Sequence, residues 1–262
     1  MITGFDDRGI DLALLTFWAF LIFFAGLIFY LHRENKREGY PLVESSGDRR
    51  RGRVSIIGWP APPPSKTYHL ASGESVLVAG GRPDTRAIAA TPMAKFPGAP
   101  LIPTGNPLVD GVGPAAYAER ADVPDRLFSG EPRILPLRIL TDFHVAEQDP
   151  DPRGMTLVAG DREVVGTIAD VWVDRAEYVI RYLEAEIPGA GSPRRVMIPM
   201  GFCSFQPSRR RVVVNALYGK HFADVPALAN PDRITLLEED KVMGYFGGGL
   251  LYAAPGRQEP II

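Results

Sequence analysis

The side chains best suited to chemistry in this sequence are two carboxylates in its second half. Asp174 ends the β-branched run 163–174, and Glu177 follows it shortly before the next such run. Carboxylates at a buried protein interface have raised pKa values, because burial disfavours the charged form, and they can then relay protons near neutral pH. Acids in a solvated turn are the alternative, and the two residues alone leave both interpretations open.

Other reactive patterns are weak. The four histidines lie outside metal-ligand spacing of one another, and no nucleophile motif accompanies the pair Asp142 and His144. Gly111 opens a run that resembles a dinucleotide fingerprint, but Pro114 crowds the position that should approach the pyrophosphate. No G-x-S-x-G, H-E-x-x-H or P-loop motif occurs. The sequence therefore predicts a protein that is not an enzyme, with no catalytic residue and no metal site.

Composition narrows the class of partner. The chain has 29 Lys and Arg against 31 Asp and Glu, and a net charge of −2 argues against a nucleic-acid partner. A single thiol, Cys203, excludes an internal disulfide and fits a reducing compartment. The basic cluster of Arg49, Arg50, Arg51 and Arg53 can attract anionic lipid headgroups or stand in a solvated loop.

The elements that must hold these residues begin with a membrane anchor. Residues 12–31 carry no charge, and at a rise of about 1.5 Å per residue they span roughly 30 Å, the thickness of a bilayer core. A secretory signal peptide would have a basic leader and a shorter apolar run, whereas residues 1–11 are acidic. We expect an uncleaved transmembrane helix, which either anchors the chain alone or packs against other spans.

Basic residues predict the orientation of this helix, because Lys and Arg are enriched on the cytoplasmic side. Only Arg8 precedes the span, whereas Arg33, Lys36 and Arg37 follow it. We therefore expect residues 1–11 in the periplasm and the rest of the chain in the cytoplasm. The same three basic residues, together with Tyr30, are predicted to contact the membrane surface and its lipids.

The region 32–152 is predicted to be extended and rich in turns. It holds most of the prolines, with 17 of the 25 between Tyr40 and Pro152, and proline breaks both helix interiors and central strands. One short strand is expected from Ser75 to Ala79. A long irregular segment of this kind is typically functional or laid against a partner.

The region 153–262 is predicted to be a small antiparallel barrel with a C-terminal helix. Short alternating or β-branched runs follow one another at close spacing, at 156–159, 163–174, 178–187, 194–200 and 210–217. Thr235 and Glu238 form a capping-box pattern that opens the helix, with Glu239 in its first turn to suit the helix dipole. The glycines between Gly244 and Gly249 are expected to end it.

Four blocks of sequence, in this order, resemble the H subunit of the purple-bacterial photosynthetic reaction centre. They are REGYPL (37–42), PTGNPLVDGVGPAAYAERAD (103–122), DVWVDRAE (170–177) and LLEEDKVMGYFGGGLLYAAP (236–255). The resemblance implies one transmembrane helix and a mainly-β cytoplasmic domain of the PRC-barrel type. It also implies a location in the bacterial inner membrane, including its intracytoplasmic or chromatophore extensions.

The resemblance further implies partners and a role. Such a subunit caps the L and M subunits on the cytoplasmic side, stabilises the complex and contributes to the proton route to the secondary quinone. The complex carries bacteriochlorophyll, bacteriopheophytin, quinones and non-haem iron, none of them bound by this chain. A light-harvesting antenna and a cytochrome are expected elsewhere in the assembly.

Site residues carry over by position. Glu177 matches the family's proton-relay glutamate, and Asp174 matches its companion aspartate. The family's Asp-Gly-His-Gly-His proton entry is not kept, because Ser129 and Glu131 stand where the histidines would be. Asp125 and Glu131 are therefore the candidate substitutes in the proton entry.

A relay acid is expected to combine burial, which raises its pKa, with a nearby cation that moderates the rise. Arg175 and Arg181 are the expected cations. The alternative to a reaction-centre subunit is a membrane-anchored PRC-barrel adaptor unrelated to photosynthesis, which would have no reason to keep the first and last of the four blocks.

Overall fold

A computed structural model describes residues 11–37, 40, 42–43, 55–56, 58–78, 84–96, 99–189 and 193–258. The leader 1–10 and the basic cluster of Arg49, Arg50, Arg51 and Arg53 lie outside the described residues. The chain forms two compact units, Met1–Asp84 with Lys95–Ala99, and Thr85–Ala94 with Pro100–Ile262.

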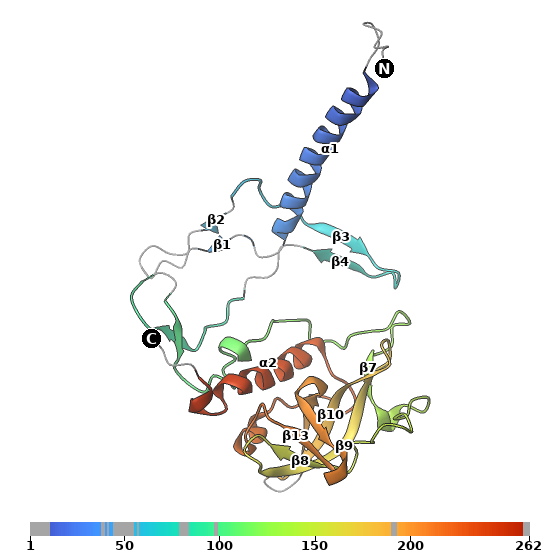
Figure 1. Cartoon of the computed structure of the whole chain (residues 1–262), viewed down its shortest axis with the longest axis vertical. Coiled ribbons are helices and arrows are strands. Elements are labelled where there is room, and N and C mark those ends of the chain that lie inside the picture. Colours follow the sequence, from blue (N-terminus) through green and yellow to red (C-terminus); the bar gives the residue numbers. More distant parts are fainter. Residues whose placement is uncertain are drawn as a thin grey trace, which may run out of the picture. The chain divides into compact units, whose positions relative to one another are not determined.

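The first unit contains the predicted apolar helix, α1, which spans Leu12–Glu34 and continues into the 3-10 turn η1, Asn35–Arg37 (Figure 1). Asp11 caps its start, since its Oδ1 accepts hydrogen bonds from the amides of Ala13 and Leu14 at 3.0 and 3.1 Å. Its large apolar side chains are exposed, at a cost of about 25 cal/mol per Å² in water. Of the described helices, α1 is the one long and apolar enough to cross a membrane, so it fits a single-pass membrane protein.

Two basic side chains at the end of α1 bind the chain that follows. The Lys36 ammonium is buried and donates to the carbonyl of Pro60 at 2.7 Å. The Arg37 guanidinium pairs with Glu34 at 2.6 Å and donates to the carbonyl of Pro64 at 2.8 Å. Prolines supply acceptors without donors, so these two cations hold the proline-rich segment against the helix end.

The strands of the region 32–152 are short, as its prolines predict. In the first unit β1 (Leu42–Val43) pairs with β2 (Ser55–Ile56), and β3 (Lys66–His69) pairs with β4 (Ser75–Val78). In the second unit β5 (Ala90–Pro92) pairs with β6 (Leu101–Pro103). The predicted strand at 75–79 is thus β4, although residue 79 is outside the described residues.

The second unit is built on a seven-stranded sheet in the order β11-β10-β9-β8-β13-β12, with β7 also paired to β9. Its strands are β7 (Ile134–Pro136), β8 (Thr156–Ala159), β9 (Val164–Asp174), β10 (Val179–Ile187), β11 (Arg194–Pro199), β12 (Cys203–Gln206) and β13 (Arg211–Val214). Along one edge of β9, β8 pairs with its first half and β7 with its second half. This long strand therefore joins the proline-rich region to the barrel.

All five predicted runs form strands, and the mainly-β domain with a C-terminal helix is confirmed. The expectation of a wholly antiparallel barrel is wrong in one pair, because β8 and β13 run parallel, with Thr156 opposite Arg211. A long excursion through β9–β12 separates these two strands, so no hairpin forces them to be antiparallel. The strands β7 and β12 carried no predictive signal, and β7 includes Pro136, which suits only an edge position.

The C-terminal helix α2 spans Leu236–Tyr252 and begins as predicted. The Thr235 Oγ1 accepts the Glu238 amide at 3.1 Å, while the Glu238 side chain accepts the Thr235 amide at 2.9 Å. Phe246 packs its buried ring near Phe202 and Phe222 in the barrel core. The helix thus covers the barrel with an apolar face (Figure 1).

The predicted end of this helix at Gly244–Gly249 is wrong, because α2 continues through these glycines. A Cβ at Gly244 would lie 2.8 Å from the carbonyl oxygen of Ala115, and a Cβ at Gly249 would lie 2.5 Å from that of Ala216. Ala115 ends the 3-10 turn η2, Gly113–Ala115. This turn lies in the run after Gly111 whose sequence resembles a dinucleotide fingerprint. The glycines therefore let other backbone segments approach the helix closely.

Replacing Gly249 by Ala should destabilise the barrel despite the better helix propensity of alanine, about 1 kcal/mol. The new methyl group meets a backbone carbonyl that cannot move aside alone, so we expect the free energy of unfolding to fall by about 1–3 kcal/mol. Denaturant unfolding of the full chain in detergent measures it. Gly201→Ala is the control, because its Cβ would meet no atom within 4 Å. A Gly249→Ala variant as stable as this control would contradict the packing role.

Candidate functional site

One arginine gathers three of the four carboxylates predicted to carry protons. The register that places Ile134 opposite Asp174 brings Arg133, just before β7, beside the end of β9. Its Nε lies 2.9 and 3.0 Å from the two Asp174 oxygens, and its Nη2 lies 2.6 Å from Glu177 Oε1. Its Nη1 reaches Asp125 Oδ2 at 3.4 Å. We call Asp125, Arg133, Asp174 and Glu177 the Arg133 cluster.

The fourth predicted acid lies next to this cluster on its own cation. Glu131 pairs with Arg175 at 2.8 Å, and the Arg175 amide donates to the carbonyl of Arg133 at 3.0 Å. Arg175 also donates to the carbonyl of Pro132 at 3.2 Å. The structure thus brings all four predicted residues together, while their role in proton transfer stays a prediction.

The two central acids of the Arg133 cluster differ in exposure. The side chain of Asp174 is 1% exposed, whereas that of Glu177 is 58% exposed. Asp174 also accepts the backbone amides of Ala176 and Glu177, at 2.9 and 3.2 Å. Asp174 is consequently fixed in place, and Glu177 is the acid that faces outward.

The expectation of a raised pKa at a buried relay acid is wrong for Asp174. Burial raises the pKa of its carboxyl group, but the Arg133 guanidinium and the amides of Ala176 and Glu177 together hold that pKa below its usual value. The hydrogen bond to Asp174 likewise raises the pKa of Arg133. The Asp174 carboxyl group therefore stays deprotonated and negatively charged near neutral pH.

The cation beside Asp174 and Glu177 differs from the two expected, although Arg175 does pair with the candidate acid Glu131. Arg133 takes the place predicted for Arg175 or Arg181, because β7 pairs with β9 and brings it from 41 residues away. Nothing in the spacing of the sequence signals this pairing. The one hint in the sequence is that the basic residue Arg133 lies in a short run bounded by Pro132 and Pro136.

A second network of buried acids lies inside the barrel and supports its structure. Arg138 pairs with Asp170 at 3.1 Å and with Glu184 at 2.7 Å, and Trp172 Nε1 donates to Glu184 at 2.7 Å. Arg195 lies 2.9 Å from the other oxygen of Glu184. Each carboxylate of this network has a cationic partner, as the cost of burying an unpaired charge requires.

A different acid does have a raised pKa. Burial raises the pKa of Glu239, while a 2.8 Å hydrogen bond from Tyr182 and the charges of Arg181 and Arg120 lower it in part. The sequence pattern assigned Glu239 only to the helix dipole, because its burial depends on how α2 packs against β10. Within the described residues, no group of three His, Cys, Asp or Glu side chains could hold a metal ion.

Four residues were predicted to contact the membrane surface. Tyr30 and Arg33 are exposed at the end of α1. Lys36 and Arg37 are occupied by the carbonyls and the carboxylate described above. Contact of these four residues with lipid stays a prediction.

Two protein-family models match the chain. Residues 6–139, about half of the chain, match the N-terminal region of the photosynthetic reaction centre H-chain. Residues 144–221 match the PRC-barrel domain. The Arg133 cluster contains residues from both matched regions. The first match includes Asp125 and Arg133, and the second includes Asp174 and Glu177.

Acid should destabilise the barrel through Asp174. Because its pKa is lowered by folding, the unfolded chain binds more protons, and stability should fall as the pH drops from about 5 through about 4 and below. Asp174→Asn should make this fall shallower. The measurement is the unfolding midpoint of the full chain against pH, with the exposed Glu147→Gln as control. Identical acid slopes in Asp174→Asn and the parent chain would refute the assignment.

Proposed function

Because the chain belongs to the family of photosynthetic reaction centre H chains, we propose that it caps the L and M subunits of such a complex on the cytoplasmic side. In this position it would stabilise the complex and form part of the proton route to the secondary quinone. The match over residues 6–139, which includes both α1 and the proline-rich region, is the observation that supports it. A free adaptor would need only the barrel, so the match also favours this function over the adaptor.

The membrane arrangement is part of this proposal. α1 crosses the inner membrane of a purple bacterium, with residues 1–11 in the periplasm, 32–152 as a membrane-proximal extended region and 153–262 as the cytoplasmic barrel domain. The excess of basic residues after α1 supports this orientation. Tyr30 and Arg33 then lie at the level of the lipid headgroups, where aromatic and basic side chains are favoured.

Two exposed aromatic rings support a partner surface around the Arg133 cluster. Phe128 is 92% exposed in the loop between Asp125 and Glu131, and Tyr178 is 78% exposed beside Glu177. Large exposed apolar side chains near a cluster of functional residues are typical of interaction sites. A subunit that covers these rings would also bury the outward face of Glu177.

The chemistry of the route follows from the differing environments of the acids. Reduction of a quinone to a quinol consumes two protons in a site that excludes water, so protons must pass along side chains and water. Asp174 stays charged and, with Arg133, holds Glu177 at the protein surface. In the proposed route Glu177 is the relay acid, and the half-buried Asp125 and the exposed Glu131 form the proton entry.

No redox cofactor is assigned to this chain in the proposal. The bacteriochlorophyll, bacteriopheophytin, quinones and non-haem iron belong to the L and M subunits. A light-harvesting antenna and a cytochrome complete the assembly around them. The chain itself is a structural and proton-conducting subunit rather than an enzyme.

Purification through a tag on this chain, from its native membrane, tests the complex directly. The isolate should show near-infrared bacteriochlorophyll bands that bleach reversibly in light. A colourless isolate would refute the proposal and favour the adaptor.

Glu177→Gln should slow the proton-coupled transfer of the second electron to the secondary quinone by about tenfold, since an amide cannot carry the proton. Assembly should be unchanged, because glutamine has nearly the same size and its amide oxygen can still accept the hydrogen bond from Arg133. Flash-induced absorption changes from about pH 6 to about pH 9 measure this rate. Glu186→Gln is the control, being a partly exposed acid paired with Arg195 outside the Arg133 cluster. A rate that matches the control over this whole range would rule out Glu177 as a relay.

A further inference from the structure

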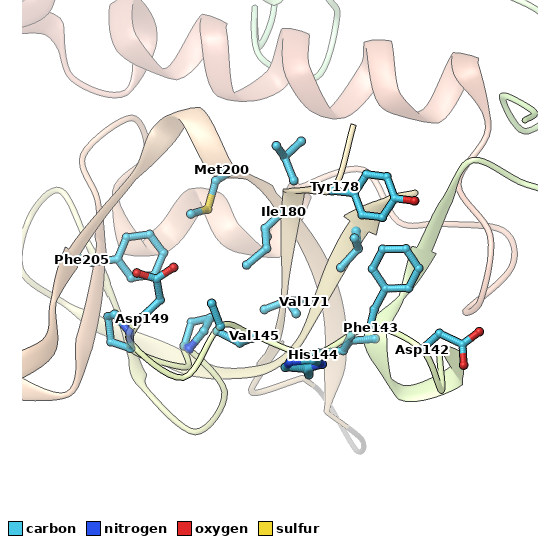
Figure 2. A pocket seen from close by; sticks show the side chains of 16 residues that line it. Asp142, Phe143, His144, Val145, Asp149, Val171, Tyr178, Ile180, Met200 and Phe205 are labelled. Atoms are coloured by element: carbon cyan, nitrogen blue, oxygen red, sulfur yellow. The ribbon is translucent and has the colours of Figure 1, made fainter. Parts of the chain in front are cut away.

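The barrel carries a second feature, a pocket of about 690 Å³ that no residue of the Arg133 cluster lines. Its walls are mainly apolar. They come from β9, β10 and β12, from the loop that precedes β8 and from Met200, which directly follows β11; Val171, Ile180, Phe205 and Phe143 are among the other lining residues (Figure 2). A pocket of this size and lining is typical of binding sites.

The rim of the pocket is held in an unusual backbone conformation. Tyr178 has a φ of +57°, which is uncommon for a residue other than glycine. Its amide donates to the Asp174 carbonyl at 2.8 Å, and its ring stacks on Phe143 with 5.5 Å between ring centres. The exposed Tyr178 ring is therefore held against Phe143 as part of the pocket lining.

The acidic side chains at this pocket have no basic counterpart among the lysines and arginines. Asp142 and Asp149 line it together with His144, and no Lys or Arg does. Across the described part of the chain, neither aspartate forms an ion pair. Figure 2 places Asp142 beyond Phe143 at one end and Asp149 beside Phe205 at the other. An occupant with positive charge near both ends complements this arrangement, whereas an anionic lipid headgroup does not.

One wall of the pocket also offers backbone amides and carbonyls that can form hydrogen bonds with a ligand. Residues 143–146 have no helix, turn or bend and belong to no strand pair. Within the described ranges, the amides and carbonyls of Phe143, His144 and Val145 form no backbone hydrogen bond. Backbone without hydrogen-bond partners beside an apolar pocket can receive a peptide by strand addition.

We propose that this pocket binds an extended segment of a partner polypeptide whose apolar side chains are flanked by Lys or Arg. The apolar side chains fill the space between Val171 and Phe205, and the segment pairs with the backbone of 143–145. Its basic residues meet Asp142 and Asp149. The inference does not depend on the proton route, because no residue of the Arg133 cluster lines the pocket.

The test uses the full chain in a non-ionic detergent and a fluorescent synthetic peptide of alternating valine and threonine with a lysine at each end. Fluorescence anisotropy should show saturable binding that weakens with added salt. The double variant Asp142→Asn with Asp149→Asn should bind about threefold to tenfold more weakly, because two exposed ion pairs are lost. Both aspartates are exposed, so the variant should keep its fold.

Glu147→Gln is the matched control, since Glu147 is an exposed acid on the same loop that does not line the pocket, and it should bind as the parent chain does. A peptide with glutamate in place of lysine should not bind. Absence of saturable binding, equal binding of the glutamate peptide, or full affinity in the double variant overturns the proposal. Saturable binding of a fluorescent phosphatidylcholine in place of the peptide also overturns it and assigns the pocket to an acyl chain. A chain dimer that the double variant abolishes, without peptide binding, overturns it in favour of a second copy.

Discussion

The pairing of Arg133 with the buried Asp174 is the interaction on which the second unit depends most. Desolvation of a carboxylate costs several kcal/mol unless a cation and hydrogen-bond donors replace the lost water. Here one guanidinium and two backbone amides do so. The same guanidinium holds β7 against the end of β9, orients Glu177 and reaches Asp125. The position of every candidate proton carrier therefore follows from one ion pair, with Glu131 attached through the neighbouring Arg175.

A second set of buried acids in the barrel is also neutralised by an arginine. Arg138 binds Asp170 and Glu184 within the sheet, so both buried acidic networks have an arginine from the segment 133–138, and Arg195 adds a second cation at Glu184. The segment 133–138 is consequently a structural part of the barrel and supplies a cation to each of its two networks of buried acids. The close contact of α2 with the 3-10 turn 113–115 adds a second attachment of the proline-rich region.

Much of this fold was predictable, and the failures have physical causes. β-branched runs identified five strands because local alternation reflects burial on one face, and the capping box located the start of α2. Its end was missed because Gly244 and Gly249 serve packing, a tertiary role that local propensity does not express. The four candidate acids came from family resemblance, whereas Arg133 was missed because its contacts depend on a pairing across 41 residues. The lowered pKa of Asp174 could not be foreseen without that cation.

The attachment of Lys36 and Arg37 to the carbonyls of Pro60 and Pro64 has a mechanical consequence. The end of α1 and the segment 60–64 move as one body, so the helix cannot slide or rotate without displacing the chain beyond it. A bilayer of different thickness changes the preferred tilt of a transmembrane helix at a cost of fractions of a kcal/mol per Å of mismatch. Through these two contacts, a change in membrane thickness that tilts α1 also exerts a force on residues 60–64.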